Sequence, residues 1–262
     1  MSKKYTIRDI AKQAGVSVAT VSYVINNRDD QRISEETKKK VRQIINLLDY
    51  RPNSSAKSLA TNKTYTVALY LTPESSLYKR SEQLFVAENL ASVLKRHGYH
   101  LILQSSNDQN PIDYADAVLC YDTTTEFFCE IGDKNLIPLI AVDVLIDAPL
   151  QIFFQVCTDY TRLKAEADAH FGEDSYTYLC LSPNNKEVRA LLEGTFPHVR
   201  FVDKEPVPTE GNLAYSQDVL RTLVPAGAFY ISYDYQSKME QVFSCMELAI
   251  NRIPDCAHNL FV

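Results

Sequence analysis

The feature that most constrains this chain is an alternation, after residue 64, of short apolar segments with longer amphipathic ones. Segments such as 67–71 and 139–142 have the length and composition of buried strands, and 84–96 has the spacing of a helix packed on one side. Strands that alternate with helices are typical of a parallel sheet. We expect an α/β body made of two successive lobes, the second opened by a strand near 152–156.

The length and composition exclude several classes of protein. A chain of 262 residues predicts one large domain and one small one. Its apolar stretches are too short to cross a membrane, and early charges leave no room for a signal peptide, so we expect a cytoplasmic protein with no membrane partner. The cysteines lack metal-ligand spacing and are predicted to be reduced core thiols: Cys120, Cys129, Cys157, Cys180, Cys245 and Cys256.

The charge of the chain is divided unevenly. The net charge is −6, but residues 1–63 contain 13 Lys and Arg against 6 Asp and Glu, a net +7. The other 199 residues contain 14 basic against 27 acidic residues, a net −13. A small basic head joined to a large acidic body is compatible with nucleic-acid binding through the head.

Three short helices are predicted in the head. Thr6, Ser17 and Ser34 each precede one of them, where a hydroxyl can accept a hydrogen bond from a free backbone N–H group. Gly15 supplies the positive φ of a tight turn between the first two. The helices are expected over 7–13, 18–26 and 35–50. Residues 53–63 are too polar for an isolated helix and are predicted to be a linker that becomes helical on binding.

Sequence motifs for catalysis are missing. The chain contains no glycine-rich nucleotide loop, no GxSxG and no HExxH, and its five histidines are far apart. We predict no catalytic residues, no cofactor and no metal site. An enzyme built on the α/β body remains the alternative from a different class, because a spatially assembled site leaves no motif.

Residues 6–26, 33–37 and 50–60 closely resemble the LacI/GalR family of bacterial transcription regulators. The resemblance implies a second helix that reads the major groove and a hinge helix, 53–63, that enters the minor groove of a near-palindromic operator bound by a homodimer. It also implies a two-lobed doubly wound body, residues 64–262, similar to periplasmic sugar-binding proteins and able to sense a small sugar-like effector. The helix-turn-helix domain would be residues 1–52.

The resemblance and the helix pattern together predict the DNA contacts. A helix N-terminus that enters a groove places its first exposed side chains against base edges, and the predicted base readers are Val18, Ala19 and Tyr23. Hydroxyl and amide groups suit phosphate oxygens, and the predicted backbone contacts are Thr6, Ser17, Thr20, Ser22 and Asn26. Thr6 and Ser17 could instead serve only as helix caps.

The hinge residues implied by the family are Ala56, Lys57 and Leu59. Leu59 matches an intercalating leucine, an apolar wedge that unstacks a base step. Its alternative role is packing between the linker and the body.

In the body, the resemblance implies effector contacts near the ends of strands, where ligands bind in open α/β sheets. The candidates are Tyr121, Asp143, Arg189 and Asp234. A surface ion pair or a helix cap is the competing role for the last three. The chain departs from the family after residue 257, where a last crossover and a pocket aspartate are expected but not found, so the body is predicted to be shortened at its C-terminus.

The sequence therefore predicts a DNA-binding transcriptional regulator, a repressor, that acts as a dimer and responds to a small sugar or related effector. An effector-independent dimer whose shortened body only dimerises is the alternative.

Overall fold

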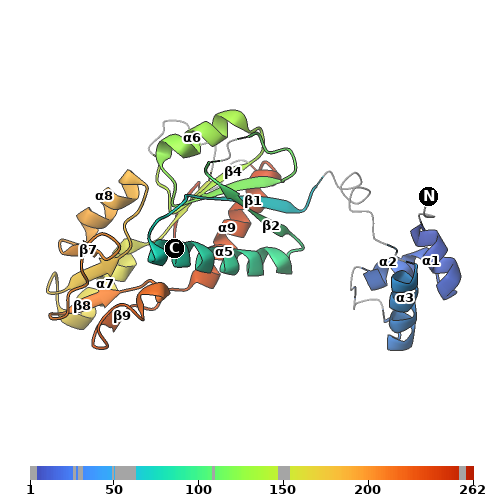
Figure 1. Cartoon of the computed structure of the whole chain (residues 1–262), viewed down its shortest axis with the longest axis horizontal. Helices are drawn as coiled ribbons and strands as arrows, with labels where there is room; N and C mark the ends of the chain where they lie inside the picture. The colour runs from blue at the N-terminus through green and yellow to red at the C-terminus, as the bar shows by residue number, and fades with distance from the viewer. Residues whose placement is uncertain are drawn as a thin grey trace. The chain divides into compact units, whose positions relative to one another are not determined.

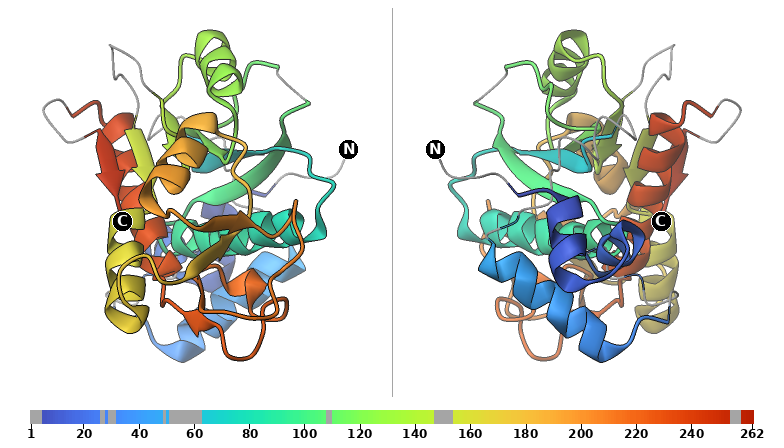
Figure 2. Two further views of the ribbon diagram at one scale, coloured as in Figure 1. Left: turned by 90° about the vertical axis from the view of Figure 1, so that its left-hand side faces the viewer. Right: turned by 90° about the vertical axis from the view of Figure 1, so that its right-hand side faces the viewer.

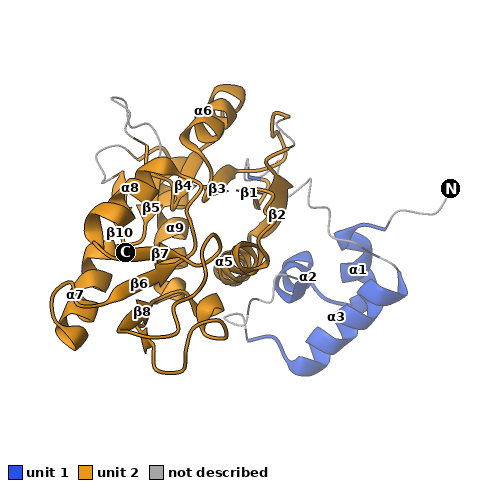
Figure 3. Cartoon of the chain, turned by 60° about the vertical axis from the view of Figure 1, so that its left-hand side comes forward, with its two compact units in different colours: residues 1–63 blue, residues 64–262 orange. Residues whose placement is uncertain are grey.

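The computed structural model describes residues 5–25, 28, 32–48, 50, 63–107, 110–146, 154–253 and 258–262. The chain divides into two compact units, a head of residues 1–63 and a body of residues 64–262 (Figure 3).

The head contains three helices, α1 (Ile7–Ala14), α2 (Val18–Ile25) and α3 (Glu35–Leu47) (Figure 1). Thr6 and Asp9 form a reciprocal capping box at the start of α1, and Gly15 ends that helix at φ 69°. Apolar residues from all three helices form one core, in which Ile10, Val21 and Val41 are fully buried. Local caps and apolar spacing therefore produce the predicted helix-turn-helix unit.

The first lobe of the body is a six-stranded parallel sheet in the order β10-β5-β4-β3-β1-β2. Its strands are β1 (Thr66–Leu71), β2 (His100–Ser105), β3 (Ala117–Tyr121), β4 (Leu139–Val142), β5 (Phe154–Cys157) and β10 (Asn259–Phe261).

Helices cover both faces of this sheet (Figures 1 and 2). On one face α5 (Leu77–Arg96) and α9 (Tyr235–Ile250) pack against alternate strand residues such as Leu69 and Leu119. On the other face α6 (Thr125–Lys134) packs against the intervening residues, such as Val118. Burial on both faces explains why the inner strands β1, β3 and β4 read as continuous apolar runs.

The second lobe is a four-stranded parallel sheet in the order β7-β6-β8-β9. Its strands are β6 (Thr177–Cys180), β7 (Val199–Phe201), β8 (Leu213–Tyr215) and β9 (Phe229–Tyr230), accompanied by α7 (Tyr160–Phe171), α8 (Lys186–Thr195) and the short 3-10 helix η2 (Asp218–Leu220). The predicted α/β body with two lobes is confirmed.

Two expectations about the lobes are wrong. The strand near 152–156 does not open the second lobe, because β5 pairs with β4 in the first sheet, with Ile140 opposite Phe154. The chain also returns to the first lobe, since α9 packs on its core and β10 pairs with β5. The apolar side of α9, which includes Met239 and Val242, requires this return because it is covered by first-lobe residues.

Candidate functional site

The first candidate site is the exposed surface of α2 in the head. Ser17 precedes this helix, and its hydroxyl accepts a hydrogen bond from the Thr20 backbone N–H at 3.0 Å. Val21 and Val24 fix the buried side, whereas Val18 is 41% exposed and Ala19 is exposed beside it. Tyr23 is half-buried one turn later. The start of α2 therefore presents apolar side chains that the head core does not use.

The predicted backbone contacts of the head have structural roles as well. The Thr6 hydroxyl donates to Asp9 Oδ2 at 2.7 Å, and the Ser17 and Thr20 hydroxyls lie 2.8 Å apart. Ser22 is half-buried on α2. A capping hydroxyl keeps further lone pairs and a rotatable hydrogen, so capping and phosphate contact are compatible. Asn26, Ala56, Lys57 and Leu59 lie outside the described residues.

The second candidate site is a cavity in the body, lined by residues that directly follow strands of both sheets. Asp122 follows β3, Asp143 follows β4 and Thr158 follows β5 from the first sheet, and Ser216 follows β8 from the second. Asp122 and Asp143 have positive φ values of 46° and 50°, which Asp tolerates better than most residues. Both residues line the cavity.

An ion pair between Lys238 and Asp143 occupies one side of the cavity. Lys238 Nζ lies 2.6 Å from each Asp143 carboxylate oxygen and 2.9 Å from Thr158 Oγ1. Lys238 is only 2% exposed. Burial alone would lower the pKa of Lys238, but the Asp143 carboxylate outweighs it and holds that pKa above its usual range. Lys238 is therefore charged in the folded protein at neutral pH.

A second lysine joins the two lobes. Lys79 Nζ on α5 lies 2.9 Å from Glu74, 3.3 Å from Asp122 and 2.8 Å from Asn184 Oδ1 in the second lobe. The Asn184 backbone N–H donates to Asp122 at 2.7 Å. Burial raises the pKa of Asp122 to about 6, because the nearby Lys79 offsets only part of the desolvation.

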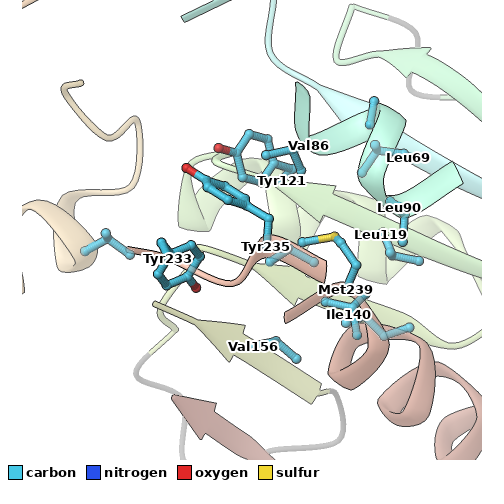
Figure 4. Close-up of a cluster of buried hydrophobic side chains, with 14 of the residues drawn as sticks. Leu69, Val86, Leu90, Leu119, Tyr121, Ile140, Val156, Tyr233, Tyr235 and Met239 are labelled. Atoms are coloured by element: carbon cyan, nitrogen blue, oxygen red, sulfur yellow. The ribbon is translucent and has the colours of Figure 1, made fainter. Parts of the chain in front are cut away.

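Glu82 lies one helical turn after Lys79, and neither of the two described cavity lysines forms an ion pair with it. Its Oε1 accepts a hydrogen bond from the Tyr235 hydroxyl at 3.0 Å, and Glu82 is 4% exposed. Burial raises its pKa to about 7, although hydrogen bonds to the carboxyl act in the opposite direction. Figure 4 shows Tyr121, Tyr233 and Tyr235 grouped at the margin of the buried apolar cluster.

The structure brings together two of the four predicted effector residues. Tyr121 and Asp143 line the cavity. Arg189 on α8 instead pairs with Glu193 at 2.9 Å and lies over the Phe201 ring. Asp234 caps α9 by accepting from the Ser237 backbone N–H at 2.9 Å, and neither Arg189 nor Asp234 lines the cavity.

Sequence reasoning missed Lys79, Glu82 and Lys238. A signal was present for two of them, because Glu82 shares a helical face with Val86 and Leu90, and Lys238 shares one with Val242 and Cys245. A charged residue within an apolar stripe requires a buried partner.

The cysteines and the candidate metal ligands add no site. Cys120, Cys157, Cys180 and Cys245 are buried free thiols, and burial raises the pKa of Cys157 to about 12. Cys129 is exposed, so the prediction that every cysteine lies in the core is wrong there. Within the described part of the chain, no three His, Cys, Asp or Glu residues gather as metal ligands, and no helix is long and apolar enough to span a bilayer.

The fold defines a class of protein in which a helix-turn-helix head precedes a two-lobed α/β body. Residues 6–53 match the family described as "Bacterial regulatory proteins, lacI family". The match spans the three helices of the head, α1, α2 and α3.

Among its relatives are catabolite control proteins A from Streptococcus mutans, 37% identical over 105 residues, and from Staphylococcus aureus, 40% identical over 106 residues. Each match covers 40% of this chain and 30% of the relative's length.

Solved structures of low sequence identity share the fold. A lac repressor dimer bound to operator and an anti-inducer has a TM-score of 0.57 at 15% identity, covering 99% of this chain and 96% of that one. A LacI regulator from a Rhodococcus species has a TM-score of 0.51 at 12% identity, covering 75% of this chain and 94% of that one. These similarities extend the shared architecture from the head to the body.

Proposed function

We propose that this chain is a sequence-specific DNA-binding transcriptional regulator that represses the genes beside its operator. The observation that carries the proposal is the first turn of α2, where Val18 and Ala19 are exposed although the opposite face of the helix is buried. A helix start of this kind on a head of net charge +7 suits a major groove, where apolar side chains contact thymine methyl groups.

The test is recovery of bound fragments from the genome, followed by footprinting with the full chain. A near-palindromic footprint is expected, and binding should weaken steeply with salt as counterions return to the phosphates. Binding that is independent of salt, or equally strong for a protein lacking residues 1–63, would contradict the proposal.

Two substitutions in α2 should separate base reading from backbone contact. Tyr23→Ala is expected to cost about 1 to 3 kcal/mol at one base position of each half-site and to relax preference there. Thr20→Ala should weaken all sequences by a similar factor, because a phosphate contact carries no sequence information. Binding-site selection measures both, and an unchanged preferred site for Tyr23→Ala would remove this residue from the readout.

A homodimer is part of the proposal, and an apolar surface on the first lobe supports it. Leu77 and Leu84, which are 72% and 55% exposed, lie two turns apart on one side of α5. Neighbouring β2 is the edge strand of the sheet and exposes Ile102 and Leu103. An uncovered edge strand beside exposed leucines marks an association surface. The lac repressor structure with the same fold is described as a dimer on its operator.

We expect the double substitution Leu84→Lys with Leu103→Lys to convert the dimer to a monomer, because two ammonium groups would be desolvated at the interface. Sedimentation velocity at micromolar concentration measures this. The matched control is Leu136→Lys, since Leu136 is 99% exposed just after α6, the helix that covers the opposite face of the sheet from α5. A double variant that sediments as the parent does would place the dimer interface elsewhere.

We also propose that the cavity of the body binds a small polar effector. Tyr121 and Asp143 remain the candidate contacts, whereas Arg189 and Asp234 would need a rearrangement to reach it. A ligand alters DNA affinity only as far as it prefers one closure state of the lobes. One observation favours an effector-independent dimer instead, namely that Lys238 already occupies both oxygens of Asp143.

A further inference from the structure

The two lysines of the cavity have no free hydrogen bond to offer a ligand. An ammonium group donates three hydrogen bonds. Lys238 directs its bonds to Asp143 and Thr158, and Lys79 contacts Glu74, Asp122 and Asn184. Among the described lining residues, no other lysine or arginine faces the cavity. A phosphate or carboxylate would therefore find no available cation.

Glu82 offers the opposite chemistry. Its Oε2 is buried and accepts no hydrogen bond from any described residue, although Gln217 lies near the carboxyl and lowers its pKa. Its other oxygen is held by Tyr235. A buried carboxylate oxygen that accepts no hydrogen bond destabilises the protein when the cavity holds no ligand. A ligand that donates a hydrogen bond to this oxygen removes that destabilisation.

The surroundings of Glu82 favour positive charge. With Glu82 ionised, three carboxylates face two lysines in the lining, and Glu74 shares Lys79 as well. Burial raises the pKa of Tyr121, and the Glu82 carboxylate raises it further, as it does for Tyr235. Tyrosine rings also attract cations through their faces, and Lys238 Nζ lies 5.6 Å from the centre of the Tyr233 ring.

We propose that the cavity binds a small organic cation, an aliphatic amine that carries hydroxyl or further amine groups, with its ammonium on Glu82 Oε2. The hydroxyl groups of the tyrosines hold the rest of the ligand. This inference rests on the effector role proposed for the same cavity, and it names the chemical class that the effector would have.

The affinity for such an amine should depend on pH. The titratable groups around Glu82 are Lys79 on its own helix, Tyr121 at the end of β3, Asp122 directly after β3, Asp143 after β4, and Tyr235 and Lys238 at the start of α9. Because the pKa of Glu82 is about 7, its carboxylate form is a minor species at pH 6 and the major one at pH 8. Binding of a ligand that stays protonated should tighten about tenfold over that interval.

Calorimetric titration of the full chain tests the proposal with matched pairs of probes: glucosamine against glucose, and putrescine against butanediol. Glucose phosphate serves as the anionic probe. We expect the amine to bind at least about tenfold more tightly than its neutral partner in one pair or more, as a charge-assisted hydrogen bond provides. Glu82→Gln should abolish this preference, and Glu88→Gln, an exposed position on the same helix, should retain it.

Several outcomes would overturn the inference. These are an absence of binding by any amine, equal or tighter binding of the neutral or phosphate probes, and a preference that survives Glu82→Gln. Thermal melting of the Glu82→Gln variant, which removes an unpaired buried charge, should show a melting temperature at least as high as that of the parent at pH 8. If glucose binds and glucosamine does not, the cavity is still an effector site, and only the proposal that the effector is an amine is wrong. Binding of operator DNA is measured in a separate experiment.

Discussion

Asp143→Asn is expected to lower the free energy of unfolding of the body by about 3 to 5 kcal/mol at neutral pH, because it leaves the Lys238 ammonium buried without a counter-charge. Lys238 is 2% exposed and its remaining partner is the Thr158 hydroxyl. Denaturant unfolding followed by circular dichroism measures the change. The loss should shrink as pH rises, since Lys238 can then deprotonate.

The reverse substitution, Lys238→Met, should lower the free energy of unfolding by an amount at the lower end of that range, about 3 kcal/mol. The Asp143 side chain is 18% exposed and keeps hydrogen bonds from the Thr158 backbone N–H and hydroxyl. The double variant Asp143→Asn with Lys238→Met should be more stable than Asp143→Asn alone, because no charge stays buried. Lys186→Met is the matched control, as its side chain is 81% exposed and its change should stay within about 0.5 kcal/mol.

A loss below about 1 kcal/mol for Asp143→Asn would mean that the pair is solvated or that Lys238 has another partner. The experiment therefore tests the geometry on which the cavity chemistry depends.

The head could be predicted from the sequence because its determinants are local. Thr6 and Ser34 cap helices three residues from the N–H groups that they serve, and Ile10 and Val21 follow helical spacing. Strands such as β4 were predicted for the same reason, since a short apolar run between polar segments indicates a buried strand.

The assignment of β5 to a sheet could not be predicted in this way. A buried strand of four residues has the same sequence pattern in either lobe. Which strand it pairs with depends on the point at which the chain crosses from one lobe to the other. The position of α9 was missed for the same reason, because its apolar stripe does not say which sheet it covers.

The candidate site was predicted only in part. Strand ends led to Tyr121 and Asp143, whose positions follow from sheet topology. The partner of Asp143 lies 95 residues further along the chain, and no local pattern connects the two. Arg189 was placed near the cavity by sequence comparison, but its pairing with Glu193 within α8 turns it to the surface.

Ile10→Ala is expected to abolish operator binding by unfolding the head while the body stays folded. Ile10 is fully buried in a core formed by six buried residues of three short helices, and Ile→Ala at such a site costs about 2 to 5 kcal/mol. A unit of this size has a total stability of only about 3 to 9 kcal/mol, so the substitution removes much of it. Gel-shift titration with the footprinted operator, together with calorimetric melting, measures both consequences.

Leu47→Ala provides the matched control, because Leu47 ends α3 and is 80% exposed, so the same type of truncation should leave melting and DNA affinity nearly unchanged. The expected contrast arises because burial, and not apolarity alone, determines the cost of removing side-chain atoms. If Ile10→Ala bound the operator as tightly as the parent protein does, DNA recognition would not depend on the folded head. The proposed function would then be wrong.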